Sequence, residues 1–140
     1  MIDLNQIHDF FDQCFDLHGE TAQGVGWNSP EAQEIRFDQL LKVVQPGKPF
    51  TFIEYGCGYG LPYMRAQGLS PDHYYGIDIL ESSLAAAREQ FADDPSASFH
   101  TALADVPVAD YLSASGVFNV KLQHDNASWT RYVINSLDEF

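Results

Sequence analysis

The stretch FIEYGCGYG, from Phe52 to Gly60, joins an apolar run to a glycine-rich turn. The run PFTFIEYG predicts a short buried β-strand that ends at the first glycine. Three of the chain's ten glycines then fall at every second position: Gly56, Gly58 and Gly60. Glycine permits positive φ angles and lets the backbone approach a ligand closely. The stretch therefore predicts a ligand site at the carboxyl end of the first strand of a parallel sheet.

Outward from this turn, strand patterns alternate with helix patterns. Short apolar runs predict further strands at 73–80, 96–103 and 109–120. Helical spacing predicts helices at 61–67, 82–94 and 127–140. Strands that alternate with helices predict an α/β fold, here a mostly parallel Rossmann-like sheet of about four strands flanked by helices.

Two helices are expected before the first strand. Apolar residues recur at helical spacing over 4–18 and again over 30–44, and Asp3 and Ser29 are suited to cap their starts. For a chain of 140 residues one domain is the expectation. We predict a single domain over 1–140, with a helical cover at 1–47 and a partial Rossmann-like core at 48–140.

Composition narrows the class of partner. The formal net charge is −13, from 20 acidic and 7 basic residues, which argues against a nucleic-acid surface or an anionic membrane. No apolar run approaches a membrane span, and the first residues do not resemble a signal peptide. Cys14 and Cys57 are expected to be free thiols, the five histidines show no metal-ligand spacing, and a cytoplasmic location is predicted.

The glycine spacing does not fit a dinucleotide fingerprint well. That fingerprint would place glycine or alanine at position 61, where this chain has Leu61. A nucleotide oxidoreductase is therefore the weaker alternative.

Two acidic residues indicate a different ligand. Glu54 stands before the turn, and Asp78 ends the next predicted strand, 18 residues after Gly60. A carboxylate beside the turn suits a cationic group, and an acid at the second strand's end can take both hydroxyls of a ribose. The pair predicts a ligand that carries a ribose and a positive charge, and S-adenosylmethionine has both.

The ordered motifs resemble those of class I S-adenosylmethionine-dependent methyltransferases. They are Glu54-x-Gly56-x-Gly58-x-Gly60, the strand GIDI with ESSLAAAR after it, and the fourth-strand segment SASGVFNV. The entry segment HGETAQGVGWNSPEAQEIRF resembles the N-terminal part of a bacterial group of these enzymes with unassigned substrate. The resemblance implies methyl transfer to a small-molecule or protein acceptor.

The resemblance also implies roles for individual residues. The methionine end of the cofactor would be held by Glu54 and the glycine turn, Cys57 included, and the ribose by Asp78. The remaining contacts would come from Ile79, Leu80, Asp105, Trp27 and Arg36. Of these, Ile79 or Leu80 would line the adenine, Asp105 would lie near its amine, and Trp27 and Arg36 would cover the cofactor and bind its carboxylate. For these last three residues, an ordinary loop acid, packed aromatic or surface arginine stays an equal alternative.

The chain also departs from this family. The family's domain has seven strands, and the last three have no counterpart here, so we expect either a truncated enzyme or a natural half-domain. A non-catalytic S-adenosylmethionine-binding or interaction half-domain is the alternative function. No catalytic base is indicated, although Asn119 lies where the family often places acceptor-side groups. The apolar fourth strand would be an exposed edge, which predicts a homodimer that covers it.

Overall fold

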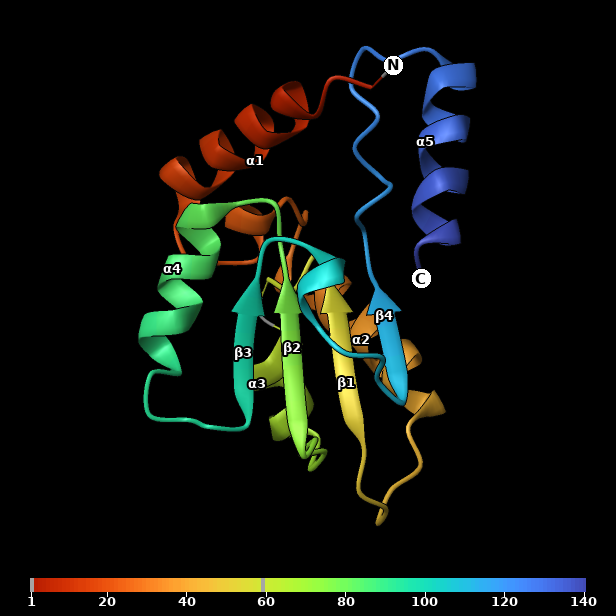
Figure 1. Cartoon of the computed structure of the whole chain (residues 1–140). Coiled ribbons are helices and arrows are strands. Elements are labelled where there is room, and N and C mark those ends of the chain that lie inside the picture. The colour runs from red at the N-terminus through yellow and green to blue at the C-terminus, as the bar shows by residue number, and fades with distance from the viewer. Residues whose placement is uncertain (1, 59) are drawn as a thin grey trace.

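The computed structural model describes residues 2–58 and 60–140 (Figure 1). Its α-helices are α1 (Leu4–His18), α2 (Pro30–Leu40), α3 (Gly60–Ala66), α4 (Glu81–Gln90) and α5 (Asn126–Asp138). Its strands are β1 (Thr51–Tyr55), β2 (His73–Ile77), β3 (Ala97–His100) and β4 (Tyr111–Ala114). Three single 3-10 turns complete it: η1 (Gln23–Val25), η2 (Leu41–Val43) and η3 (Leu103–Asp105). None of the described helices is both long and apolar enough to cross a membrane.

The four strands form one parallel sheet in the order β3-β2-β1-β4. The predicted α/β fold with a parallel sheet of four strands is thus confirmed. The chain builds outward from β1 to β3 on one side and then crosses back to place β4 on the other. The carboxyl end of β1 is therefore the point where strand order reverses, and open α/β sheets bind their ligands at such a point.

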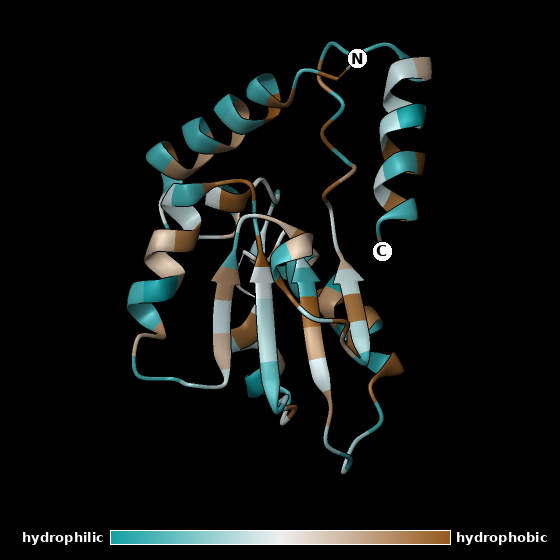
Figure 2. Ribbon diagram, in the orientation of Figure 1, coloured by the Kyte–Doolittle hydropathy of each residue, from teal (hydrophilic) through white to brown (hydrophobic). Residues whose placement is uncertain are grey.

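The core lies between one face of the sheet and the helices behind it. Every second residue of the strands, such as Phe52, Tyr74 and Phe99, points into this layer, as the two-residue period of a strand requires. Leu61 of α3 and Leu84 of α4 pack against them and are almost completely buried. Figure 2 shows hydrophobic residues in the strands and mostly hydrophilic ones on the visible side of α1.

A reciprocal set of hydrogen bonds joins β1 to the residue before β4. The Thr51 amide and hydroxyl donate to the Asp110 carboxylate at 2.7 and 2.9 Å, and the Asp110 amide donates to the Thr51 hydroxyl at 3.0 Å. Beyond it the two strands pair in register from Phe52 opposite Tyr111 to Tyr55 opposite Ala114. The amino end of β4 is thus fixed independently of its carboxyl end.

The fourth strand is shorter than predicted. β4 ends at Ala114, and residues 115–125 continue without helix or strand past the end of the sheet. Gly116 adopts a φ of +80°, a left-handed conformation that a β-strand does not accommodate. The glycine in SASGVFNV thus ends the strand, and the apolar residues after it lie on a loop that runs beside α5 (Figure 1).

Candidate functional site

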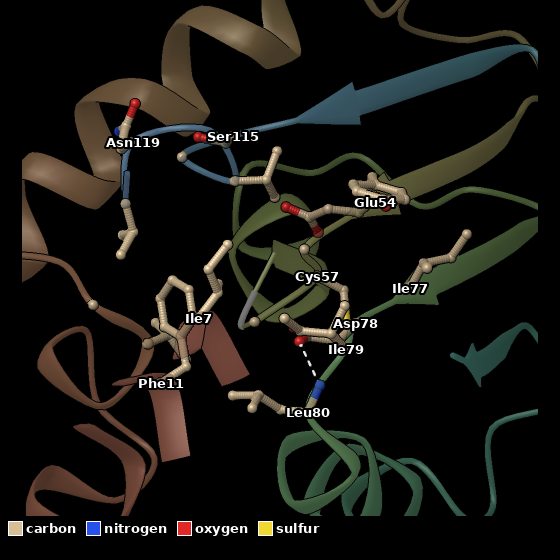
Figure 3. Close-up of a pocket in the computed structure, with 18 of the residues that line it drawn as sticks. Ile7, Phe11, Glu54, Cys57, Ile77, Asp78, Ile79, Leu80, Ser115 and Asn119 are labelled. Atoms are coloured by element: carbon tan, nitrogen blue, oxygen red, sulfur yellow. Dashed lines mark hydrogen bonds between the residues drawn. The ribbon is translucent and has the colours of Figure 1, made fainter. Parts of the chain in front are cut away.

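A cavity lies at the carboxyl ends of β1 and β2, where the strand order reverses (Figure 3). The space within it and in front of its open mouth, solvent included, is about 1070 Å³. Its walls come from α1, residues 25–27, the glycine turn, residues 115–120 and α5. Figure 1 shows α1 lying across the carboxyl ends of the strands. The first helix thus covers the site.

The glycine turn is tied to the neighbouring strand. The amides of Gly56 and Cys57 both donate to the carbonyl of Ile77, at 2.7 and 3.0 Å. Gly56 has a φ of +76°, and a Cβ there would lie 2.3 Å from a methyl of Val117. Both its backbone conformation and its surroundings therefore require glycine. Gly58 has a φ of +37° and also lines the cavity, so the predicted turn forms part of the cavity wall.

Gly60 has a packing role that sequence reasoning missed. It is the first residue of α3 and does not line the cavity. A Cβ at this position would lie 1.6 Å from Oε2 of Glu54 and 2.2 Å from its Cδ. The absence of a side chain at Gly60 therefore makes room for the carboxyl group of Glu54 beneath the start of α3.

The side chain of Glu54 is 2% exposed, and the Tyr74 hydroxyl donates a hydrogen bond to its Oε2. Burial raises the pKa of Glu54 to about 8; the hydrogen bond from Tyr74 opposes this rise, and the nearby charge of Asp78 adds to it. The carboxyl group is therefore largely protonated at neutral pH. This modifies the expectation of a fixed negative charge beside the turn.

The raised pKa of Glu54 predicts a specific pH dependence of stability. Between its ordinary value of 4.5 and about 8, the unfolded chain has lost this proton while the folded chain keeps it. The stabilisation is complete below pH 4.5 and is lost as the pH rises to about 8. The free energy of unfolding should fall by up to about 1.4 kcal/mol per pH unit across this window. Urea unfolding from pH 4 to 9 would measure it. In Glu54→Gln this component should be absent, and parallel profiles for the two proteins would contradict the assignment.

Asp78 directly follows β2 and lines the cavity (Figure 3). Its Oδ1 accepts a hydrogen bond from the Leu80 amide at 3.1 Å. Burial raises the pKa of Asp78, while the backbone amides of Leu80, Gly58 and Ile79 lower it. The side chain is thus held against both the glycine turn and the start of α4. Ile79, 42% exposed, and the buried Leu80 line the same part of the cavity.

Besides Gly60, two more predicted contact residues are not brought to the cavity: Arg36 and Asp105. The Arg36 guanidinium packs 5.0 Å above the centre of the Trp27 ring, on an exposed part of α2, and only Trp27 lines the cavity. Asp105 ends η3 and is exposed. The link from β3 to β4 holds a single 3-10 turn, and Thr101, rather than Asp105, reaches the cavity wall.

Sequence reasoning missed part of the wall. Ile7 and Phe11 of α1 lie across the cavity from Asp78 (Figure 3). Tyr55, the last residue of β1, and Tyr132 of α5 also line the cavity. The apolar stripe of the first helix is the sequence signal for this part of the wall, and a core role is its more frequent explanation. Asn119 does line the cavity, as the resemblance implied. Within the described residues, no group of three or more His, Cys, Asp or Glu side chains is placed to hold a metal ion.

Comparison with known proteins supports the family resemblance. No protein-family profile matches the chain. A Mycobacterium tuberculosis protein named "Putative methyltransferase" is 36% identical over 100 residues, which are 70% of this chain and 60% of that protein. The crystal structure of the [4+2]-cyclase SpnF matches 73% of this chain and 43% of its own, with a TM-score of 0.52 and 16% identity. The methyltransferase domain of the citrinin polyketide synthase matches 76% and 28%, with a TM-score of 0.40 and 24% identity.

The fold defines an α/β protein of the Rossmann-like class, with a cavity at the reversal of strand order. The resemblance to class I S-adenosylmethionine-dependent methyltransferases is confirmed, and the four-stranded parallel sheet is consistent with a truncated form of their fold. The match spans about three fifths of the length of its Mycobacterium tuberculosis relative.

Proposed function

We propose that the chain binds S-adenosylmethionine in the cavity and takes part in transferring its methyl group to an acceptor. The observation that carries the proposal is the meeting of Glu54, the glycine turn and Asp78 in one cavity at the strand-order reversal. The similarity to a protein named as a methyltransferase supports methyl transfer.

Each part of the cavity is suited to one part of this ligand. The glycine turn at Gly56 to Gly58 would receive the methionine end, and the Asp78 carboxylate would accept hydrogen bonds from the ribose hydroxyls. Ile79 and Leu80 would line the adenine. A positive charge beside Glu54 would favour its ionised form. Cofactor binding would then release a proton from this group near neutral pH.

S-adenosylmethionine supplies an electrophilic methyl group on a sulfonium when bound. The chain would contribute orientation of the two reactants and exclusion of water, which account for a large part of the rate of such displacements. The apolar cover formed by Ile7 and Phe11 serves that exclusion. The described residues offer no histidine or lysine in the cavity wall to act as a base.

Two observations favour a second, non-catalytic function. The similar region spans only 60% of the curated relative, and a chain of the same fold is named a [4+2]-cyclase. Fold alone does not fix the chemistry. A protein that binds S-adenosylmethionine without transferring its methyl group is therefore the alternative.

Calorimetry separates these proposals. Titration with S-adenosylmethionine and S-adenosylhomocysteine should give saturable binding, with NAD as the control ligand that should not bind. No binding at millimolar S-adenosylmethionine would reject both functions. Binding without formation of S-adenosylhomocysteine in the presence of a broad acceptor set would favour the non-catalytic one.

We also propose a homodimer that covers the β4 edge. β4 pairs only with β1 among the described strands, and Ile134 and Leu137 on α5 are 53% and 54% exposed. Unpaired edges and exposed apolar side chains favour association. Sedimentation equilibrium should give twice the chain mass of 15.7 kDa. Leu137→Glu should weaken association if α5 forms the interface. A monomer at all concentrations would contradict the proposal.

We place the protein in the cytoplasm as part of the same proposal. Both cysteines are free, and burial raises the pKa of the Cys57 thiol well above its ordinary value. Free thiols are usual in reducing compartments, and a buried neutral thiol is unreactive.

A further inference from the structure

The end of the cavity nearest α5 is built from braced aromatic side chains. Tyr55, the last residue of β1, and Tyr132 of α5 both line it. The Tyr55 ring lies 5.0 Å from the ring of Phe140, and the Tyr132 ring lies 5.1 Å from Trp129 and 6.1 Å from Phe118. Such contacts hold rings in fixed positions. This end therefore presents a flat, firm, mostly apolar surface.

The charged side chains in the cavity wall are all acidic. Among the described lining residues, the acids are Glu54 and Asp78 beside the glycine turn, and there is no Lys, Arg or His. Burial raises the pKa of both Tyr55 and Tyr132, so their hydroxyls are neutral near pH 7. A carboxylate or phosphate held there would lose its hydration without gaining a cationic partner, which is costly.

The neutral polar groups near this end are few and specific. They are the tyrosine hydroxyls, the Ser115 hydroxyl and the Asn119 amide. An uncharged ligand could exchange hydrogen bonds with them without the cost of desolvating a charge.

The cavity is open at its mouth and covered along one side. Its space of about 1070 Å³ includes this open mouth, through which a second molecule can reach a bound cofactor. Trp27 packs against Gly116, where an added Cβ would lie 3.0 Å from the indole ring. The entry segment therefore meets the loop after β4 above the cavity. A compact molecule fits this enclosure better than a polymer chain passing through it.

We propose that the acceptor is a small, uncharged molecule with a flat apolar body, bound between Tyr55 and Tyr132 at the α5 end of the cavity. This inference rests on the proposed function. A lone pair on nitrogen or sulfur of the acceptor would form the bond to the methyl carbon as the sulfonium carbon–sulfur bond breaks. S-adenosylhomocysteine would leave with the bonding electrons, and the acceptor's proton would pass to water.

Three probes of equal size and different charge test the proposal: benzamide, benzoate and benzylamine, which is a cation at pH 7. Each is titrated into labelled protein saturated with S-adenosylhomocysteine and followed by NMR chemical shifts. Benzamide should bind at least about tenfold more tightly than benzoate or benzylamine and should shift the Tyr132 and Asn119 signals. Tyr132→Ala should weaken benzamide at least fivefold, whereas Arg131→Ala, an exposed neighbour on α5 outside the cavity, should not.

The outcomes separate this inference from the proposed function. Equal or tighter binding of either charged probe, no binding of any probe, or an unchanged benzamide affinity in Tyr132→Ala would overturn it. Tyr132→Leu retains apolar bulk and guards against loss of fold, and unchanged S-adenosylhomocysteine binding by the variant confirms an intact site. If S-adenosylhomocysteine fails to bind while benzamide still binds at Tyr132, the ligand class stands and the cofactor proposal falls.

Discussion

Replacing Asp78 by asparagine is expected to raise the dissociation constant for S-adenosylmethionine by roughly 10- to 100-fold. Hydrogen bonds to a charged group contribute about 1.5–3 kcal/mol, and each 1.4 kcal/mol is tenfold in affinity. Asparagine keeps an oxygen for the Leu80 amide, which now donates to Oδ1 at 3.1 Å. The start of α4 should therefore stay in place, and the loss should report on the ribose contact. Calorimetry measures it.

Asp105→Asn is the matched control for this experiment. Both changes remove one carboxylate, but Asp105 is exposed and does not line the cavity. The affinity of the Asp105→Asn variant for S-adenosylmethionine should stay within about twofold of that of the unchanged protein. If Asp105→Asn lost as much affinity as Asp78→Asn, the ligand would not lie where the cavity places it.

Replacing Gly60 by alanine is expected to reduce the free energy of unfolding by about 1–3 kcal/mol or more and to weaken cofactor binding with it. Overpacking a filled core has costs of this size. The new Cβ would lie 1.6 Å from Oε2 of Glu54, whose side chain is 2% exposed and hydrogen-bonded to Tyr74. The carboxyl group therefore has little room to move aside. Urea unfolding gives the loss directly.

A double-mutant cycle with Glu54→Ala distinguishes this steric clash from a destabilising effect of alanine at position 60 that does not involve Glu54. Removing the carboxyl group empties the space that the Gly60→Ala methyl would enter. The double variant should therefore be at least about 1 kcal/mol more stable than the sum of the single losses, because residues in contact couple. Simple additivity would show that the steric explanation is wrong.

The parallel sheet and the turn could be predicted because their signals are local. The strand pattern, the glycines and an acid at the end of β2 each depend on a few neighbouring residues, and Asp78 lies where the pattern placed it. The role of Gly60 could not be predicted in this way. It depends on the side chain of Glu54 passing under α3, which is a tertiary contact.

The rest of the wall depends on packing between distant segments. Phe11 and Tyr132 belong to the first and last helices, and nothing in their spacing indicates which side of each helix faces the sheet's carboxyl edge. Arg36 illustrates the opposite error. A cation near the cofactor was plausible from sequence, but its guanidinium packs on the Trp27 ring instead.

The hydrogen bonds between Thr51 and Asp110 have a consequence for how the site can adapt. They fix the amino end of β4, which is the end farther from the cavity. Beyond its carboxyl end, Gly116 adopts a left-handed conformation and the chain leaves strand geometry. The loop after β4 therefore follows a strand whose position is fixed by these hydrogen bonds. A substitution in this loop is therefore expected to change the cavity wall while the strand register of the sheet stays unchanged.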